Sequence, residues 1–378
     1  MRKIITRRQV LGAIGTATAL GTAGCLGYDA SGTSGNWPSF GHDVKNSGYS
    51  PDVNGPRKHP SVQWIFDLAG WSSPALVDDT IYVGSDDTHF YAVDPADGSQ
   101  RWRYDTDDWV SSYPAVADGR VFSTSENDYL HSVDAGTGDR KWRTQVAYVA
   151  SGSPTVHEGT VYIGTWDEKL YALDIVDGSE QWQFRGTWNI PNPPAIVDGM
   201  VFVVSDTLYG LDADSGEERW HFDLDAYGPT SYHTTAGPTA TADTVFFGTD
   251  FAKMYAFDTK SGEQRWVFET DMAVRSSPAV ADGVLYFGSD DKHLYAVSAD
   301  TGEEVWRFDA GALVRSAPAV SAETVYFGTT AGYLFALDRT SGEELWRLPP
   351  QINYQMTAPL IVADGTVYTS SGHLIAIS

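Results

Sequence analysis

Two arginines and a group of aromatic residues are the side chains best placed to do chemistry in this chain. Arg275 and Arg315 stand at matching positions, each three residues before a proline. A guanidinium group holds a carboxylate or similar anion through paired hydrogen bonds, so the pair suits an anionic ligand. The aromatic candidates stand in comparable stretches of the chain, at Trp71, Trp109, Trp166, Trp188, Tyr232, His233 and Tyr354.

The common catalytic and metal-binding motifs are missing. The sequence has no His-Glu-x-x-His, no Gly-x-Ser-x-Gly, no Gly-x-Gly-x-x-Gly and no phosphate-binding loop. Three acidic pairs, Asp86-Asp87, Asp167-Glu168 and Asp290-Asp291, lack the ordered spacing of a calcium loop. The sequence therefore assigns no catalytic residue and no metal site, and it favours a protein that is not an enzyme.

The elements that position these candidates belong to a repeat. A proline recurs at Pro74, Pro114, Pro154, Pro194, Pro238, Pro278, Pro318 and Pro359. A tryptophan ends each unit, at Trp102, Trp142, Trp182, Trp220, Trp266, Trp306 and Trp346, and the eighth lies near the start of the chain, at Trp64. Units of about 40 residues with an Asp-Gly turn and a Gly-containing second turn are typical of four short strands.

Eight such units predict an all-β, eight-bladed β-propeller of four-stranded antiparallel blades. The last unit has no tryptophan strand of its own, so residues 62–66 are expected to supply it beside residues 357–377. This pairing would close the ring and remove its open edge. We expect one propeller domain over residues 37–378.

The repeat pattern Ala-x-Asp-x-x-Thr/Ser-Gly-x-x-x-Trp resembles the tryptophan-docking repeat of the pyrroloquinoline-quinone-type propellers; an example runs from Ala213 to Trp220. Residues 37–43, with Asn46, Gly48, Tyr49 and Pro51, also resemble the leading segment of such propellers. The resemblance implies that the eight repeat tryptophans dock between blades. The family includes quinoprotein alcohol dehydrogenases and propeller lipoproteins of outer-membrane assembly (BamB).

The resemblance leaves two functions open. A small dehydrogenase would bind pyrroloquinoline quinone (PQQ) and calcium in the central funnel, but the chain lacks the adjacent cysteine pair that many such enzymes carry. The favoured alternative is a scaffold without a cofactor, which binds a protein or a ligand. Strand alternation places the aromatic candidates and both arginines on one face, where they form a binding surface. In the other interpretation, the aromatic residues plug the channel and the arginines pair with Asp271 and Asp309.

The N-terminal residues resemble a signal for export and lipid anchoring. Arg7 and Arg8 precede an apolar run and resemble a twin-arginine signal. Small residues directly before Cys25, the only cysteine, resemble a lipobox. We expect residues 1–24 to be a signal peptide and residues 25–36 a flexible tether, with a lipid on Cys25 holding the protein to the outer face of the membrane. A plain signal peptide with a free cysteine is the alternative.

The net charge of the chain limits the classes of partner that it can bind. With 50 acidic and 25 basic residues, the chain has a formal net charge of -25. Such a charge repels phosphate backbones and excludes nucleic acid as a partner. The acid excess resembles that of proteins from halophilic archaea. The sequence thus predicts an extracytoplasmic, membrane-anchored monomer that binds a protein partner or a small ligand.

Overall fold

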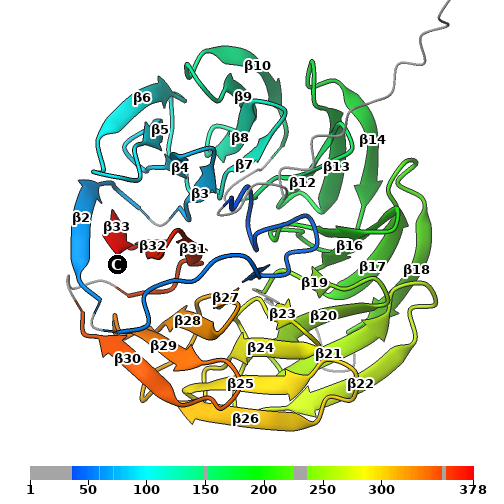
Figure 1. Ribbon diagram of the computed structural model, residues 1–378. Coiled ribbons are helices and arrows are strands. Elements are labelled where there is room, and N and C mark those ends of the chain that lie inside the picture. The colour runs from blue at the N-terminus through cyan, green and yellow to red at the C-terminus, as the bar shows by residue number, and fades with distance from the viewer. Residues whose placement is uncertain (1–35, 59, 71, 148–151, 225–235, 351–354) are drawn as a thin grey trace, which may run out of the picture.

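The protein is a closed ring of eight four-stranded antiparallel sheets, seen along its axis in Figure 1. The computed structural model describes residues 36–58, 60–70, 72–147, 152–224, 236–350 and 355–378. We number the blades 1 to 8 by the order of their innermost strands in the chain. The prediction of an all-β, eight-bladed propeller is confirmed. No helix long and apolar enough to cross a bilayer occurs among the described residues.

The strands of each blade follow one another from the axis to the rim. The innermost strands of blades 1 to 8 are β3 (Ala75–Val77), β7 (Ala115–Ala117), β11 (Thr155–His157), β15 (Ala195–Val197), β19 (Thr239–Ala240), β23 (Ala279–Ala281), β27 (Ala319–Ser321) and β31 (Ile361–Ala363). The second strands are β4 (Thr80–Gly84), β8 (Arg120–Ser125), β12 (Thr160–Gly164), β16 (Met200–Val204), β20 (Thr244–Thr249), β24 (Val284–Gly288), β28 (Thr324–Gly328) and β32 (Thr366–Ser370).

The third strands are β5 (His89–Val93), β9 (Tyr129–Asp134), β13 (Lys169–Asp174), β17 (Thr207–Asp212), β21 (Lys253–Asp258), β25 (His293–Ser298), β29 (Leu334–Asp338) and β33 (His373–Ile377). The outermost strands are β6 (Gln100–Asp105), β10 (Arg140–Gln145), β14 (Glu180–Arg185), β18 (Glu218–Asp223), β22 (Gln264–Glu269), β26 (Glu304–Asp309), β30 (Glu344–Leu348) and β2 (Val62–Asp67). A short strand, β1 (Tyr49–Ser50), pairs in parallel with β27.

The repeat tryptophans join each blade to the next. Trp102 of blade 1 donates its indole N–H to the carbonyl of Ala135 in blade 2, at 2.9 Å. The glycine of the same turn, Gly138, has a φ of 75° and lies against the Trp102 ring, where a Cβ would come within 2.8 Å. Six of the other seven repeat tryptophans donate to a carbonyl of the next blade in the same way.

Blade 8 is built from both ends of the chain, as predicted. Strand β2 pairs antiparallel with β33, with Trp64 opposite Ala376. Because its outer strand comes from the other end of the chain, blade 8 has no turn between its third and fourth strands. Trp346 of blade 7 therefore donates instead to the carbonyl of Pro56, at 2.7 Å.

Residues 36–57, which we call the axial segment, cross the axis of the ring and then run outward to the rim beside β30 (Figure 1). Its carbonyl groups accept hydrogen bonds from backbone N–H groups two residues after the repeat prolines, at Leu76, Val116, Ile196, Ala240, Val280 and Val320. These N–H groups lie on the inner edges of the sheets and would otherwise lack partners. The side-chain amide of Asn46 adds bonds to the carbonyls of Pro194 and Pro238. The axial segment thus ties most of the blades together at the centre.

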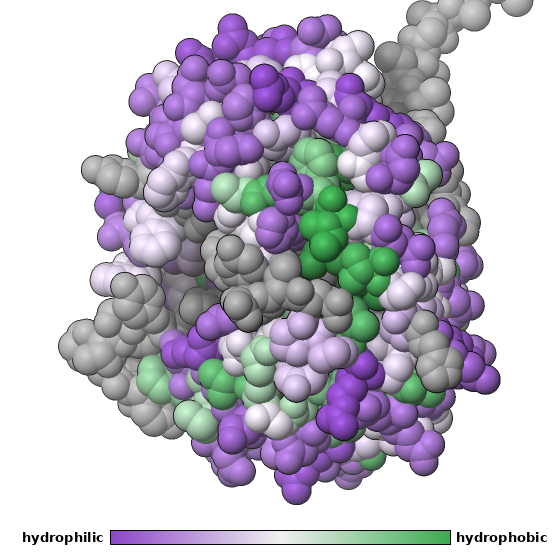
Figure 2. All heavy atoms as spheres, turned by 90° about the vertical axis from the view of Figure 1, so that its left-hand side faces the viewer, coloured by the Kyte–Doolittle hydropathy of each residue, from purple (hydrophilic) through white to green (hydrophobic). Residues whose placement is uncertain are grey.

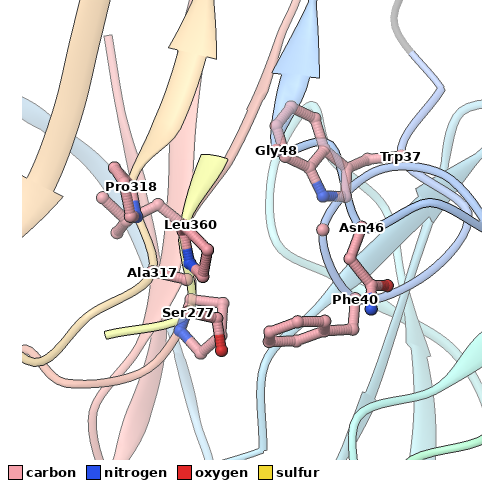
Figure 3. A pocket seen from close by; sticks show the side chains of 11 residues that line it. Trp37, Phe40, Asn46, Gly48, Ser277, Ala317, Pro318 and Leu360 are labelled. Carbon is pink, nitrogen blue, oxygen red and sulfur yellow. The ribbon is translucent and has the colours of Figure 1, made fainter. Parts of the chain in front are cut away.

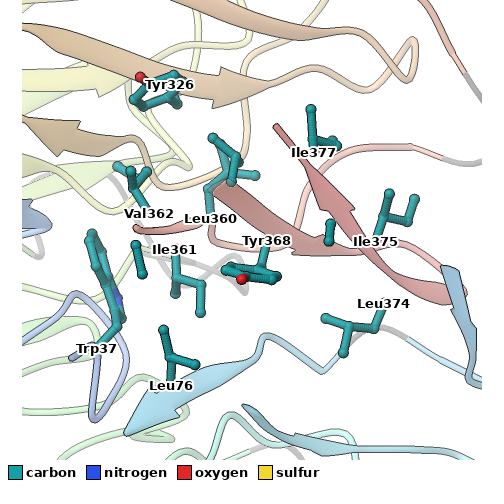
Figure 4. Packing of buried hydrophobic residues seen from close by; sticks show 14 of the residues in the cluster. Trp37, Leu76, Tyr326, Leu360, Ile361, Val362, Tyr368, Leu374, Ile375 and Ile377 are labelled. Atoms are coloured by element: carbon teal, nitrogen blue, oxygen red, sulfur yellow. The ribbon is translucent and has the colours of Figure 1, made fainter. Parts of the chain in front are cut away.

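Each blade buries apolar side chains against its neighbours. The cluster in Figure 4 combines Trp37 of the axial segment with Leu76 of blade 1, Tyr326 of blade 7 and Ile361 of blade 8. Trp37 is only 2% exposed. By contrast, the outer side of the ring that faces the viewer in Figure 2 is largely hydrophilic. The stability of the ring therefore comes from contacts between blades and along the axis.

The docking contact predicts a large loss of stability when the closing tryptophan is removed. Trp64→Ala deletes the bond to Pro95 and the contact with Gly98, so we expect the free energy of unfolding to fall by about 3 kcal/mol. Trp109→Ala, at a side chain that is 57% exposed, serves as the control and should change it by less than about 0.5 kcal/mol. Urea unfolding measures both values. Equal losses would contradict the structural role of Trp64.

Candidate functional site

One end of the ring carries the candidate residues, and we call this end the loop face. It consists of the connections between blades and the turns between the second and third strands. Hydrogen bonds join the two sets: Val314 N–H donates to the carbonyl of Ser289, and Glu126 N–H to that of Trp109. The first of these bonds belongs to blade 6, and blades 1, 3, 5 and 7 repeat it, so most of the described loops of the face are held to their neighbours in the same way.

The described tryptophans of the loop face are open to solvent. Trp109, Trp166 and Trp188 are 57%, 42% and 44% exposed. The turn that holds Trp166 and the connection that holds Trp188 are joined by a bond from Ile190 N–H to the carbonyl of Thr165. The other aromatic candidates, Trp71, Tyr232, His233 and Tyr354, lie outside the described residues, as do Arg7, Arg8 and Cys25.

The two arginines belong to a network of ion pairs across three blades. Arg275 donates from Nε to Asp250 at 2.7 Å and from Nη1 to Asp290 at 3.1 Å. Arg315 donates to both oxygens of Asp290, at 2.7 and 2.9 Å. The hydrogen bonds with Asp250 raise the pKa of Arg275 above its usual value. Two positive and two negative groups balance, so the network presents little net charge to a ligand.

The partners of the arginines differ from those considered from the sequence. Asp271 and Asp309 precede the arginines closely in the chain but do not pair with them. Asp250 and Asp290 each stand twelve residues after a repeat proline, at the start of a turn between second and third strands. That turn approaches the connection into the next blade, which brings distant residues together. The shared position in the repeat was the signal that would have identified both acids.

A pocket lies beside this network, on the axis of the ring. It has an empty volume of about 360 Å³, which includes open solvent, and its polar lining comes from Tyr113, Asn192, Arg275, Ser277, Arg315 and Thr357. Burial raises the pKa of Tyr113 to about 12, and its ring stacks on Phe40 at 5.5 Å. The Nδ2 group of Asn192 is buried and has no hydrogen-bond partner in the described part of the chain. The pocket thus offers hydrogen-bond donors around an aromatic wall.

A second, mainly apolar pocket lies on the other side of Phe40. Figure 3 shows Phe40 and Trp37 of the axial segment facing Ser277, Pro318 and Leu360. This pocket has an empty volume of about 250 Å³, which includes open solvent. Phe40, Ser277, Ala317 and Pro359 line both pockets, so the two pockets adjoin at the axis of the ring.

The donor set of the axial pocket does not fit calcium with a quinone. A calcium ion takes six to eight oxygen ligands, several of them carboxylate. The carboxylates nearest the pocket, Asp250 and Asp290, already accept hydrogen bonds from guanidinium groups. No cluster of three or more His, Cys, Asp or Glu side chains suited to a metal occurs among the described residues. We therefore route no chemistry through such a group.

Acidic side chains recur at one position of the loop face. The residue twelve positions after the repeat proline is Asp86, Glu126, Asp206, Asp250 or Asp290 in five blades. Asp86 differs from the others because its Oδ1 atom is buried without a hydrogen-bond partner among the described residues. Burial, followed by the charges of Glu126 and Asp87, raises the pKa of Asp86. Sequence reasoning considered this residue only as part of an acidic pair.

The ion-pair network predicts unequal roles for its two acids. Asp290 is 5% exposed and serves both arginines, so Asp290→Asn should lower the free energy of unfolding by about 3 kcal/mol. Asp250 serves one arginine and is more open, so Asp250→Asn should cost about 1 kcal/mol. Urea unfolding of the two variants makes the comparison. A larger loss for Asp250→Asn would contradict the assignment.

The raised pKa of Asp86 predicts a stability that depends on pH. The folded protein holds the proton of Asp86 more tightly than the unfolded chain, so the ionised group lowers stability above about pH 4. Asp86→Asn should raise the melting temperature at pH 7, and the gain should vanish below about pH 3.5. Asp206→Asn, the same charge change in blade 4, is the control for general charge relief. An equal gain from both variants would refute the prediction.

Comparison with solved structures identifies the fold. The chain matches a europium-containing methanol dehydrogenase with a TM-score of 0.79 and 14% identity, over 92% of this chain and 98% of that one. It matches BamB from Moraxella catarrhalis with a TM-score of 0.72 and 17% identity, over 85% and 100%. The quinohemoprotein alcohol dehydrogenase from Comamonas testosteroni gives 0.78 and 14%, over 92% and 82%. At these identities the likeness concerns the fold alone.

Sequence comparison identifies the family. No curated protein sequence matches the chain significantly. The family model described as outer membrane protein assembly factor BamB matches residues 58–205, 147–231 and 204–378, which together span most of the propeller. The chain therefore belongs to the BamB family of PQQ-like propellers.

Proposed function

We propose that the protein is a non-enzymatic, lipid-anchored extracytoplasmic scaffold whose loop face binds a protein partner. The observation that carries this proposal is the exposure of Trp109, Trp166 and Trp188 on one face of a rigid ring. Tryptophan is enriched among the residues that contribute most to protein–protein binding. Trp166 and Trp188 stand on adjoining loops, joined by the bond from Ile190 N–H to Thr165, and apolar side chains that gather on a surface mark interaction sites more often than single ones.

The N-terminal residues support the location. Arg7 and Arg8 with the following apolar run suit export, and Cys25 suits the attachment of lipid. Two acyl chains, each contributing about 0.8 kcal/mol per buried CH₂ group, hold a protein on a membrane. Residues 26–36 are rich in Gly and Ser and would let the ring face a membrane-bound partner. We infer a monomer that meets its partner at the cell surface.

The dehydrogenase alternative receives less support from the site. The structural neighbours include PQQ-type fold relatives such as the methanol dehydrogenase. The axial pocket, however, presents Arg275 and Arg315 where a cation would need carboxylates. Addition of PQQ and Ca²⁺ to the purified protein, with alcohol or sugar and a dye, is the direct check. We expect no dye reduction, and turnover would replace the scaffold proposal with the enzyme.

Site-specific crosslinking tests the scaffold proposal. A photoreactive residue placed at Trp109 should capture one defined membrane neighbour in cells, and one placed at Val305 on the outer edge of blade 6 should not. Trp166→Ala with Trp188→Ala should reduce the crosslink at position 109 at least about tenfold, as expected for the loss of major contacts. Val176→Ala, at another exposed apolar residue, is the matched control. Capture that is equal at positions 109 and 305 would contradict a loop-face interface.

A further inference from the structure

On the loop face, one arginine of the protein itself is bound between two acidic side chains of neighbouring blades. In blades 5 and 6, the residues twelve positions after the repeat prolines are Asp250 and Asp290. Arg275, three residues before the proline of blade 6, lies between them and donates to both. Two carboxylates at neighbouring positions of the ring are therefore spaced so that one guanidinium bridges them.

The same two positions in blades 1 and 2 hold carboxylates without an arginine. They are Asp86 and Glu126, and the residue that corresponds to Arg275 is Ser111. The Ser111 hydroxyl donates to Glu126 Oε1 at 2.6 Å but is too short to bridge the two acids. Neither acid forms an ion pair with a Lys, Arg or His side chain in the described part of the protein. Blades 1 and 2 thus have two acids at the same positions as blades 5 and 6, but no arginine of the described residues between them.

Without a cation at this site among the described residues, the carboxylate of Asp86 is left unpaired. Its Oδ1 atom is buried and accepts no hydrogen bond from the described residues, and its carboxylate lies directly against Gly70, where a Cβ would approach within 2.3 Å. A buried carboxylate oxygen without a donor costs free energy. The nearby charge of Glu126 adds to this cost. A positive charge placed between the two acids would offset their repulsion and favour the ionised form of Asp86.

We propose that Asp86 and Glu126 form the receptor site for an arginine side chain of the protein partner. The guanidinium takes the position between two neighbouring blades that Arg275 takes between Asp250 and Asp290. Arginine suits the site better than lysine because its planar fork donates to two carboxylates at once. This inference rests on the proposed function and specifies the chemistry of the partner.

Trp109 extends the site toward the rest of the partner. Its carbonyl accepts the backbone N–H of Glu126 at 2.9 Å, so the exposed indole stands in the segment beside the acids. An indole face attracts a cation or an aliphatic stem next to it. The formal net charge of -25 speeds the approach of a basic partner and repels anionic lipid or nucleic acid. A basic segment with an arginine next to an apolar residue matches these features.

A titration with acetyl-arginine-amide tests the site without the partner. The probe should bind saturably and shift the NMR signal of the Trp109 indole N–H, whereas acetyl-citrulline-amide, which is nearly isosteric and uncharged, should bind at least about tenfold more weakly. Equal binding of both probes, or no saturable shift with the arginine probe, overturns the proposal. Acetyl-lysine-amide with a free ε-amino group that binds more tightly than the arginine probe also overturns the choice of arginine.

Three variants locate the binding. Asp86→Asn and Glu126→Gln should each weaken the arginine probe about tenfold. Ser111→Arg should abolish it, because the new side chain reproduces the arrangement of Arg275 and fills the site from within. Asp206→Asn, the same change at the same ring position of blade 4, should leave the affinity unchanged. An effect of Asp206→Asn as large as that of Asp86→Asn would assign the binding to general charge and overturn the site.

The crosslinking experiment separates this inference from the proposed function. If Ser111→Arg abolishes the crosslink at position 109 while the melting temperature is retained, both are supported. If the crosslink survives in Ser111→Arg but is lost in Trp166→Ala with Trp188→Ala, the scaffold stands and the arginine site is overturned. If the probe binds as expected but no partner is captured from any loop-face position, the receptor site stands and the scaffold function fails.

Discussion

The hydrogen bond that each repeat tryptophan donates to a backbone carbonyl across the blade boundary is the contact on which the ring depends. It joins separate sheets that share no ladder hydrogen bonds, and a glycine beneath the indole lets the two blades come close. The contact repeats around the whole ring, so a single unpaired indole would leave one blade boundary open. At the boundary between blades 7 and 8 the usual turn does not exist, and the carbonyl of Pro56 takes its place. The axial segment is therefore part of the closure as well as a filling for the channel.

Much of this fold could be predicted from the sequence because a repeat exposes its own constraints. The proline and tryptophan spacing predicts the blade number, and the missing last tryptophan predicts the pairing of β2 with β33. The path of the axial segment could not be predicted in this way. The segment is held by hydrogen bonds from the inner strands to its backbone carbonyls, and every residue type has a backbone carbonyl. The resemblance of residues 37–43 to a leading segment indicated its presence but neither its path nor the role of Pro56.

The candidate site could be predicted only in part for a related reason. Arg275 and Arg315 stood out because they depart from the repeat, and the structure places both at the axial pocket. Their acidic partners could not be chosen by closeness in the chain, since Asp250 precedes Arg275 by a whole strand pair and still meets it. Contacts on the loop face connect positions of neighbouring repeats. An alignment of the eight repeats with one another would have identified Asp250, Asp290 and Asp86 together, because all three stand twelve residues after a repeat proline.

The ring needs some positions to be the same in every blade and allows others to differ. These two kinds of position lie in different parts of each blade. Positions that hold blades together, such as Trp102 and Gly138, repeat because every boundary needs the same contact. Positions twelve residues after the prolines face the loop end and take no part in the tryptophan contact, so they can hold Asp, Glu, Trp, Thr or Ser. Where neighbouring positions hold acids, a cation between them lowers their electrostatic repulsion. Blades 5 and 6 hold Arg275 between their acids, and blades 1 and 2 hold Ser111 at the equivalent position. Under our proposal an arginine of the partner takes this place, which turns an intramolecular ion pair into a means of recognition.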